Sequence, residues 1–413
     1  MSTRTLLILL AVGLFAIGTD GYVIAGLLPE VGRDLGVTDS TAGLLITVFA
    51  LAYAIGAPIL GVLTSGVPRR PLLIGSLAVF ALMNVGTALA DSYSLMMTVR
   101  VIAALAAAAF TPACSATAAA IAPEGKRGQA LATVAAGISL ATAFGVPLGA
   151  LVGGWFGWRV TFIAVAVLGG IATIGLAKLL PHVDTPPAAS LGARVAVAKV
   201  RGVPTSLGVT VLWIAGAFTV LTYISPVLED LGGVRGSALS IWLLIFGLAA
   251  VAGNSVGGRL ADRFDTTRLA VFSTLGLTVA LASFGVLGSL GVHGVAGAIA
   301  CGVVLAVWGV FGWSFMPIQQ HRMVQLAPDE AGVVLSLSAS ATYIGISLGG
   351  FAGSVALAES GVAAVGWTAG GIELCAVLAA LAIAVTHRRR TLWQVPATTT
   401  TTTVLASSSE NVL

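Results

Sequence analysis

Almost the whole chain consists of apolar stretches that are long enough to cross a lipid bilayer. A membrane-spanning helix needs about 20 apolar residues. Twelve stretches reach this length, near residues 5–28, 41–65, 71–90, 94–122, 128–153, 158–180, 205–228, 237–260, 268–289, 294–318, 331–357 and 363–386. Only 9% of the residues are charged, whereas a soluble protein carries about 25%. The sequence therefore predicts an all-α membrane protein with twelve transmembrane helices.

Basic residues are distributed unevenly between the two sides of the predicted membrane. With a cytoplasmic N-terminus, sixteen of the 20 Lys and Arg residues fall in cytoplasmic loops and tails, three fall in outer loops, and Arg100 lies within a span. Cytoplasmic loops carry such an excess. We predict that both termini are cytoplasmic in a bacterial inner membrane, and that the net charge of +4 does not indicate a nucleic-acid partner. The first 28 residues also resemble a signal peptide, but their removal would leave an odd number of spans.

The two halves of the chain resemble each other. Gly145–Gly153 matches Gly345–Gly353 at an offset of 200 residues, and Leu63-Thr64-Ser65 matches Leu260-Ala261-Asp262 at an offset of 197. Parallel repeats of this kind are a transporter architecture. We expect an N-terminal six-helix bundle over 1–180, a cytoplasmic linker over 181–204, a C-terminal six-helix bundle over 205–386 and a disordered cytoplasmic tail over 387–413.

Two charged residues, Asp20 and Arg100, lie inside predicted spans, where charges are costly and usually functional. Asp20 lies about 15 residues up the first span and Arg100 about six residues down the fourth, so a rise of about 1.5 Å per residue places them at similar depth. Pairing would favour ionised Asp20, and separation would favour its protonated form. A change in pairing would then couple protonation to conformation. The alternative is a permanent structural ion pair.

Glu373 is the other acidic residue inside a span, about seven residues from the outer end of the last one. There it would reach the lipid headgroups or a cavity. Two interpretations stay open: a second proton or cation site, or a carboxyl group whose hydrogen bonds are satisfied by its neighbours. The four histidines and three cysteines are scattered, and no phosphate-binding loop occurs. We therefore expect no metal, no other cofactor and no enzyme activity.

Several spans and loops carry motifs beyond their apolar pattern. These motifs are Gly18-Thr-Asp20-Gly-Tyr22 with Gly26-Leu-Leu-Pro29 in the first span, Leu95-Met-Met-Thr-Val-Arg100 in the fourth, Gly145, Pro147 and Gly149 with the following Trp158-Arg159 at the fifth, and Gly257-Gly-Arg-Leu-Ala-Asp262-Arg263 after the eighth. A degenerate copy of the last motif ends in Arg69-Arg70 after the second span and has Ser65 in place of an Asp.

With these motifs, residues 5–386 resemble the major facilitator superfamily, in its twelve-span drug:proton antiporter branch, and most of all the bacterial chloramphenicol, arabinose and purine efflux transporters. The resemblance implies the major facilitator fold, with the first and fourth spans adjacent. Many relatives carry their first-span acid one place later, where this chain has Gly21. The roles implied are proton coupling for Asp20 and Arg100, antiport for Gly145, Pro147 and Gly149, and a conformational loop latch for Arg69, Arg70, Asp262 and Arg263. Glu373 is a further candidate for proton coupling because it is the other acid inside a span.

Aromatic side chains in the spans are candidates for stacking on a lipophilic substrate, and amides for hydrogen bonds to it. The candidate cavity residues are Tyr22, Asn84, Trp213, Tyr223, Asn254, Trp308 and Tyr343. Each is also a plausible packing residue.

Together these features predict a proton-coupled secondary active efflux transporter. It would export a small lipophilic compound, a drug or antibiotic such as chloramphenicol, by alternating access. The alternatives are an exporter of a sugar or purine metabolite, or a proton symporter. The expected partners are a small-molecule substrate, protons and the lipid bilayer, with the protein acting as a monomer.

Overall fold

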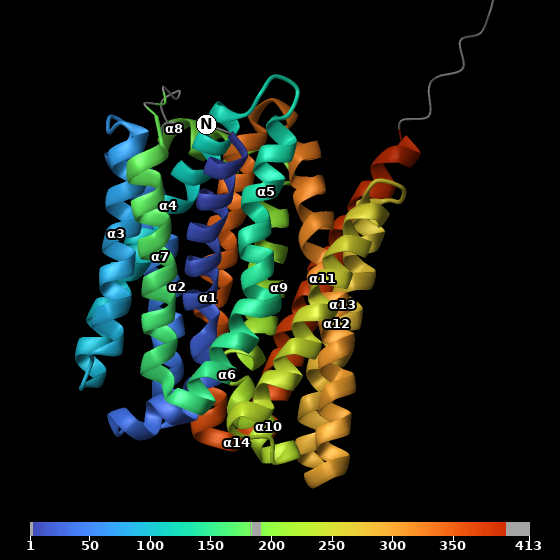
Figure 1. Ribbon diagram of the computed structural model, residues 1–413. Coiled ribbons are helices and arrows are strands. Elements are labelled where there is room, and N and C mark those ends of the chain that lie inside the picture. Colours follow the sequence, from blue (N-terminus) through green and yellow to red (C-terminus); the bar gives the residue numbers. More distant parts are fainter. Residues whose placement is uncertain (1–2, 182, 184–190, 394–413) are drawn as a thin grey trace, which may run out of the picture.

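The computed structural model describes residues 3–181, 183 and 191–393, and within them the regular structure is entirely helical (Figure 1). The helices of the first half are α1 Thr3–Leu35, α2 Asp39–Leu63, α3 Arg69–Ala88, α4 Tyr93–Ile121, α5 Arg127–Leu140, a π-turn Ala141–Gly145, α6 Val146–Phe156 and α7 Trp158–Leu179. The linker contains α8 Leu191–Ala198, and the helices of the second half are α9 Val203–Leu221, α10 Ile224–Gly232, α11 Leu239–Ala261, α12 Thr266–Ser289, α13 Gly294–Leu326 and α14 Ala331–Trp393.

Eleven helical segments of the described chain are long and apolar enough to cross a membrane, and the last of them, Pro328–Val385, is 58 residues long. This segment is too long for one crossing, because about 20 residues suffice. Gly361 interrupts it with a φ of 75° and a ψ of −167°. Residues other than glycine rarely adopt this backbone conformation. The chain reverses there, which gives α14 a first arm (331–360) and a second arm (362–393). The twelve predicted spans are thereby confirmed.

Two predicted spans are less regular than expected. The span predicted over 205–228 ends at Leu221 and continues after a short break as α10. Pro226 lies in the first turn of α10, where its ring and missing N–H prevent a continuous helix. The fifth span contains the π-turn directly before Pro147, and this wider turn accommodates the proline inside one span.

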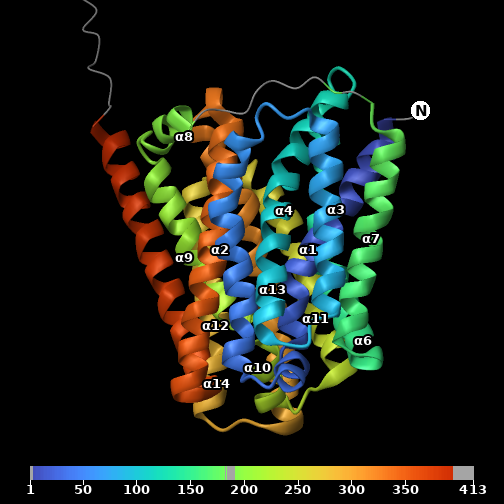
Figure 2. The same cartoon turned by 90° about the vertical axis from the view of Figure 1, so that its left-hand side faces the viewer.

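Helices of each half pack mainly on one another, and the two halves meet mainly where α2 packs on α14, where the π-turn and α6 pack on α11, and where α1 packs on α10. The N-terminus and α8 lie at one end of the bundle, called the near end here, and α10 lies at the opposite, far end (Figures 1 and 2). Large apolar side chains such as Leu82, Ile241 and Val279 are more than half exposed on the outside. A surface of this kind suits lipid.

The linker and tail differ in part from the expectation. Within the predicted linker 181–204 the chain forms α8, and residues 182 and 184–190 lie outside the described residues. The second arm of α14 continues to Trp393, into the segment predicted as a disordered tail. Residues 394–413 lie outside the described chain, so the prediction for that part stays a prediction.

Candidate functional site

Asp20 and Arg100 form an ion pair in the interior of the first half. The Nη1 atom of Arg100 donates a hydrogen bond of 3.0 Å to Oδ1 of Asp20, and the two side chains are 1% or less exposed. The predicted contact between the first and fourth spans is thus confirmed. A buried pair of this kind is costly to break from one side, because the remaining charge loses its partner.

The ion pair is incompletely satisfied by its surroundings. Oδ2 of Asp20 and the Nε and Nη2 atoms of Arg100 have no hydrogen-bond partner among the described residues. The ring of Phe49 on α2 lies 4.6 Å from the Arg100 guanidinium and contributes a cation–π interaction. A Cβ added at Gly21 would lie 3.9 Å from the same ring. The carboxyl group therefore has one bond to Arg100 and a free oxygen that can accept a proton.

Glycines of the fifth span hold α1 at close range. A Cβ added at Gly145 would overlap Oγ1 of Thr19, and one at Gly149 would overlap Cγ2 of Val23. A Cβ added at Gly18 would lie 2.9 Å from the Cβ of Ala141, in the π-turn. The antiporter-like motif therefore lies directly against the α1 turn that carries Asp20, since small residues let membrane helices approach closely.

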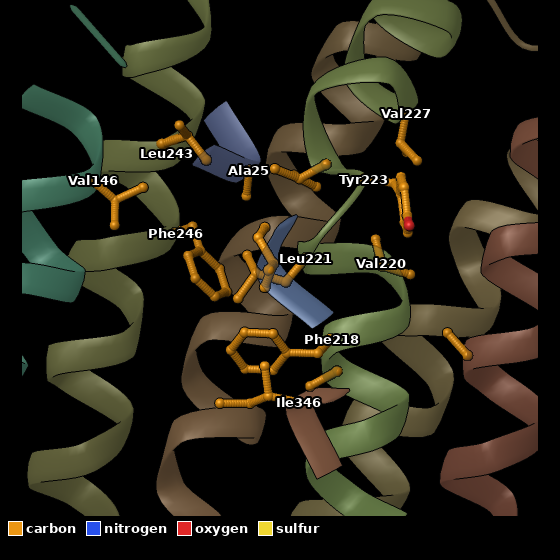
Figure 3. Packing of buried hydrophobic residues seen from close by; sticks show 14 of the residues in the cluster. Ala25, Val146, Phe218, Val220, Leu221, Tyr223, Val227, Leu243, Phe246 and Ile346 are labelled. Atoms are coloured by element: carbon orange, nitrogen blue, oxygen red, sulfur yellow. The ribbon is translucent and has the colours of Figure 1, made fainter. Parts of the chain in front are cut away.

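A small pocket lies between the two halves and begins at Tyr22, two residues along α1 from Asp20. Its lining is apolar and aromatic and comes from both halves: Tyr22, Ala25, Thr142, Val146, Phe218, Leu221, Ile224, Leu243, Phe246 and Trp313. Figure 3 shows Phe218, Leu221 and Phe246 pointing toward one another beside Ala25. No lining residue carries a charge. The lining therefore suits an uncharged lipophilic group, and in this conformation the cavity of about 20 Å³ has room for about one water molecule.

The sequence model of the Major Facilitator Superfamily matches residues 10–350. The chain belongs to this superfamily. It is 33% identical to the uncharacterized MFS-type transporter YbcL of Bacillus subtilis over 392 residues, which cover 95% of this chain and 99% of that protein. It is 39% identical to a chloramphenicol resistance protein of Streptomyces lividans over 273 residues, 65% of this chain and 70% of that protein.

The fold of this facilitator is also similar to a solved one. The crystal structure of a D-xylose–proton symporter matches with a TM-score of 0.75 at 16% identity, over 92% of this chain and 97% of that chain. The all-α, twelve-span architecture predicted from the sequence is therefore shown both by the helices and by the family, and the chain is a multi-pass membrane transporter.

Only one of the predicted cavity residues, Tyr22, lines the pocket of this facilitator. Tyr343 instead stacks on Tyr53 of α2, with ring centroids 3.6 Å apart, and so joins the two halves. The Tyr223 hydroxyl lies 3.0 Å from the Gly350 carbonyl oxygen and 3.3 Å from that of Ser40. These two tyrosines are contacts between spans rather than parts of the described pocket.

The other four predicted cavity residues lie elsewhere. Asn84 is buried and donates to the Phe80 carbonyl within α3, while Asn254 is exposed on α11. Trp213 stacks on Phe315, and Trp308 packs between Phe246 and Phe284. None of the four lines the described pocket. The sequence alone did not show which face of each helix is turned toward the pocket. The sequence also failed to select Phe218, Phe246 and Trp313, which resemble ordinary packing residues in an apolar span.

Glu373 lies on the second arm of α14 and is completely buried. The expectation that it would reach the headgroups or a cavity is not met, because its side chain is enclosed by α9. Neither of its carboxyl oxygens has a hydrogen-bond partner among the described residues. The interpretation in which neighbouring residues satisfy the hydrogen bonds of Glu373 is therefore not supported by the described residues.

The loop-motif residues lie at the near end. Asp262 approaches Nδ1 of His321 at 3.9 Å, Arg263 is exposed, and Arg70 donates a hydrogen bond of 2.6 Å to the Ala177 carbonyl. Arg69, beside Arg70, is half-buried.

A linker residue that the sequence did not indicate also lies here: Arg194 on α8 donates to Oγ of Ser336 on α14 at 2.9 Å. A Cβ added at Gly61 on α2 would lie 3.5 Å from the same guanidinium.

The Trp-Arg pair after the fifth span has a clear structural role at the far end. Trp158 donates a hydrogen bond of 2.9 Å from Nε1 to Asp34 on α1, and Arg159 pairs with the same carboxylate and lies over the Trp158 ring. Both charged side chains are more than 40% exposed.

Within the described residues, no group of three or more His, Cys, Asp or Glu side chains is placed to hold a metal ion.

Proposed function

We propose that this facilitator exports a small, uncharged lipophilic compound, a drug or antibiotic such as chloramphenicol, in exchange for protons. The observation that carries the proposal is the position of the pocket. It is formed by both halves, has no charged lining residue and begins two residues along α1 from the Asp20–Arg100 pair. A substrate and a proton would thus act on the same helix.

In this mechanism, Asp20 is the coupling acid and Arg100 its regulator. When α1 and α4 separate, Asp20 loses its partner and takes up a proton through its free Oδ2 atom, because an unpaired charge is costly in an apolar interior. When they approach again, Arg100 displaces the proton. Tyr22 moves with Asp20, so the same motion changes the pocket lining. The proton gradient drives the cycle without a bound cofactor.

The orientation and location are part of the proposal. The loop charges support a bacterial inner membrane with both termini cytoplasmic, so that the near end is cytoplasmic and the far end faces outward. The contacts of Tyr223 with Ser40 and Gly350 then close the outer end. The protein would act as a monomer, since the pocket is formed within one chain.

Sugar transport is the second candidate, because the structural neighbour is described as a D-xylose–proton symporter. A sugar presents many hydroxyl groups that each need a hydrogen-bond partner when buried. The pocket offers few such partners: the hydroxyls of Tyr22 and Thr142 and the Trp313 indole. The lining therefore favours a lipophilic substrate over a sugar or a purine metabolite.

Inverted membrane vesicles with an acidic lumen test the proposed function. Chloramphenicol, another lipophilic antibiotic, arabinose and a purine are added in turn, and proton release is followed with a pH-sensitive dye. We expect release with a lipophilic compound, and its loss in Asp20→Asn. Asp34→Asn is the matched control, because it removes an exposed Asp–Arg pair on the same helix and should leave release unchanged.

Three results would argue against the proposal. Release evoked by arabinose or the purine alone would assign a metabolite exporter. Movement of protons from the medium into the vesicles on addition of the substrate would mean that substrate and proton move together, and it would assign a symporter. An undiminished response in Asp20→Asn would exclude Asp20 as the coupling acid.

A further inference from the structure

Glu373 is an acidic side chain that the proposed exchange at Asp20 does not use. It lies in the second arm of α14, with no exposed surface and no hydrogen-bond partner for either oxygen among the described residues. The neighbouring positions Ala369, Ala376 and Ala380 on the same arm are also completely buried. The carboxyl group therefore lies inside the second half, away from lipid and water.

Two helices pack on the arm that carries this carboxyl group. A Cβ added at Gly216 of α9 would lie 2.7 Å from Oε2 of Glu373, so the missing side chain of this glycine makes the space for the acid. The α12 helix packs on the same arm, where a Cβ added at Gly370 would lie 2.9 Å from that of Ala282. The site is thus built around Glu373 by small residues.

No charged group faces Glu373 from either helix. The α9 helix contains no acidic, basic, histidine, cysteine or tyrosine residue. The only charged residue of α12 is Arg268 in its first turn, roughly 20 Å along the helix from Ala282. On the second arm itself, Cys375 is exposed and points elsewhere. Among the described side chains of these helices, no cation would offset the charge of an ionised Glu373.

An ionised carboxylate without a partner is far more costly in an apolar interior than a neutral carboxyl group. We propose that Glu373 is a second proton-binding site, located in the C-terminal half and independent of the Asp20–Arg100 pair, and that it holds a proton in the conformation described here. The proton is exchanged with water when α9 separates from the second arm of α14.

The position of α9 gives this proton a structural consequence. The helix leads directly into Tyr223, which contacts Ser40 of the first half and Gly350 of the second, and its Phe218 packs on Tyr22 with ring centroids 5.6 Å apart. An ionised Glu373 would need water at the Gly216 contact and would loosen α9. Loss of the proton therefore favours opening of the far end. That this opening serves export rests on the proposed function, whereas the proton site itself does not.

Infrared spectroscopy on the purified full-length protein tests the site without any substrate. The C=O stretching band of protonated carboxyl groups is compared at neutral pH in the wild type, Glu373→Gln, Asp20→Asn and Glu359→Gln. Glu359 is the matched control, because it is an exposed glutamate on the first arm of the same helix. We expect complete loss of one band in Glu373→Gln and its retention in the other two variants. Glu373→Asp should retain a band at a shifted frequency.

The site must also exchange its proton. In the wild type, the same band should shift in heavy water and disappear when the pH is made alkaline. An unchanged spectrum in Glu373→Gln would overturn the proposal, because Glu373 would then be ionised. A band that neither shifts in heavy water nor disappears at alkaline pH would also overturn it and make Glu373 a permanently neutral structural group.

Two further measurements separate this site from other possibilities. Loss of the band on addition of sodium at constant pH would overturn the proposal in favour of a metal-cation site. With chloramphenicol as the probe, a silent wild type in the vesicle assay would count against the proposed function while the infrared band still supports the proton site. The two proposals can thus fail separately.

Discussion

The two halves of this transporter each bury one acidic side chain, and they do so in different ways. In the first half, Asp20 is held by the guanidinium of Arg100 at 3.0 Å. In the second half, Glu373 has neither a cation nor a hydrogen-bond donor beside it among the described residues. Burial of an acid can therefore be achieved by pairing its charge or, as we propose for Glu373, by removing the charge with a proton.

Glycine contributes to both arrangements, but at different positions. Gly145 lies against Thr19, the residue before Asp20, and brings the backbone of the fifth span close to α1. Gly216 lies against Glu373 itself and provides the space that its carboxyl group occupies. A change at either glycine should therefore act on the nearby acid through packing rather than through charge.

Removal of Arg100 should have the largest effect. We expect Arg100→Met to lower the free energy of unfolding by about 3–5 kcal/mol, because Asp20 loses the one partner that its buried charge has among the described residues. The measurement is SDS-induced unfolding followed by tryptophan fluorescence. The double variant Asp20→Asn/Arg100→Met should recover most of this loss. Wild-type stability in the single variant would show that the pair is not needed to bury the acid.

A methyl group at Gly216 should have the next largest effect. Gly216→Ala places a Cβ 2.7 Å from Oε2 of Glu373, and overpacking of this kind costs about 1–3 kcal/mol. The control is Gly208→Ala on the same helix, where nothing lies within 4 Å of the added Cβ. The cost should be smaller in a Glu373→Ala background. Equal costs in both backgrounds would mean that Gly216 does not make space for the acid.

The aromatic ring beside Arg100 should have a smaller effect. We expect Phe49→Leu to lose a cation–π interaction of about 0.5–2 kcal/mol in addition to its packing loss. A double-mutant cycle with Arg100→Met isolates this energy, since the interaction is absent when the guanidinium is removed. A coupling energy of zero would show that Phe49 only fills space next to the ion pair.

Neutralisation of Glu373 should have the smallest effect on stability. Glu373→Gln replaces one uncharged group with another of similar shape, so we expect the free energy of unfolding to change by less than about 0.5 kcal/mol. Asp20→Asn, in contrast, leaves Arg100 without a partner and should cost several times more. Equal losses in the two variants, measured under the same conditions, would remove the distinction between a paired and a protonated acid.

Much of the fold follows from the sequence because its signals are long. Twelve apolar stretches specify twelve spans, and the reversal at Gly361 agrees with the predicted gap between 357 and 363. The break between α9 and α10 was not predicted, although Pro226 is a local signal for it. The residues on both sides of the break are apolar, so the sequence pattern is that of one continuous span.

The site was less predictable than the fold because it depends on which way each side chain points. The depth of Asp20 and Arg100 along their helices was sufficient to predict their contact, since both are rare charges. Phe218 and Trp313 differ in no sequence feature from the aromatic residues that pack in the core. Tyr53 was also missed, although it is one of only five tyrosines in the chain.

The glycines that face α1 from the fifth span have a consequence for how this gene can change. Every amino acid that a single base change can produce from a glycine codon carries a Cβ, and a Cβ at Gly137, Gly145, Gly149 or Gly153 would overlap an atom of α1. Apart from silent third-base changes, every single-base change to another amino acid at these codons therefore introduces such an overlap. We therefore expect variation that alters what the transporter carries at other positions, such as the codons for Phe218 and Phe246, whose side chains line the pocket.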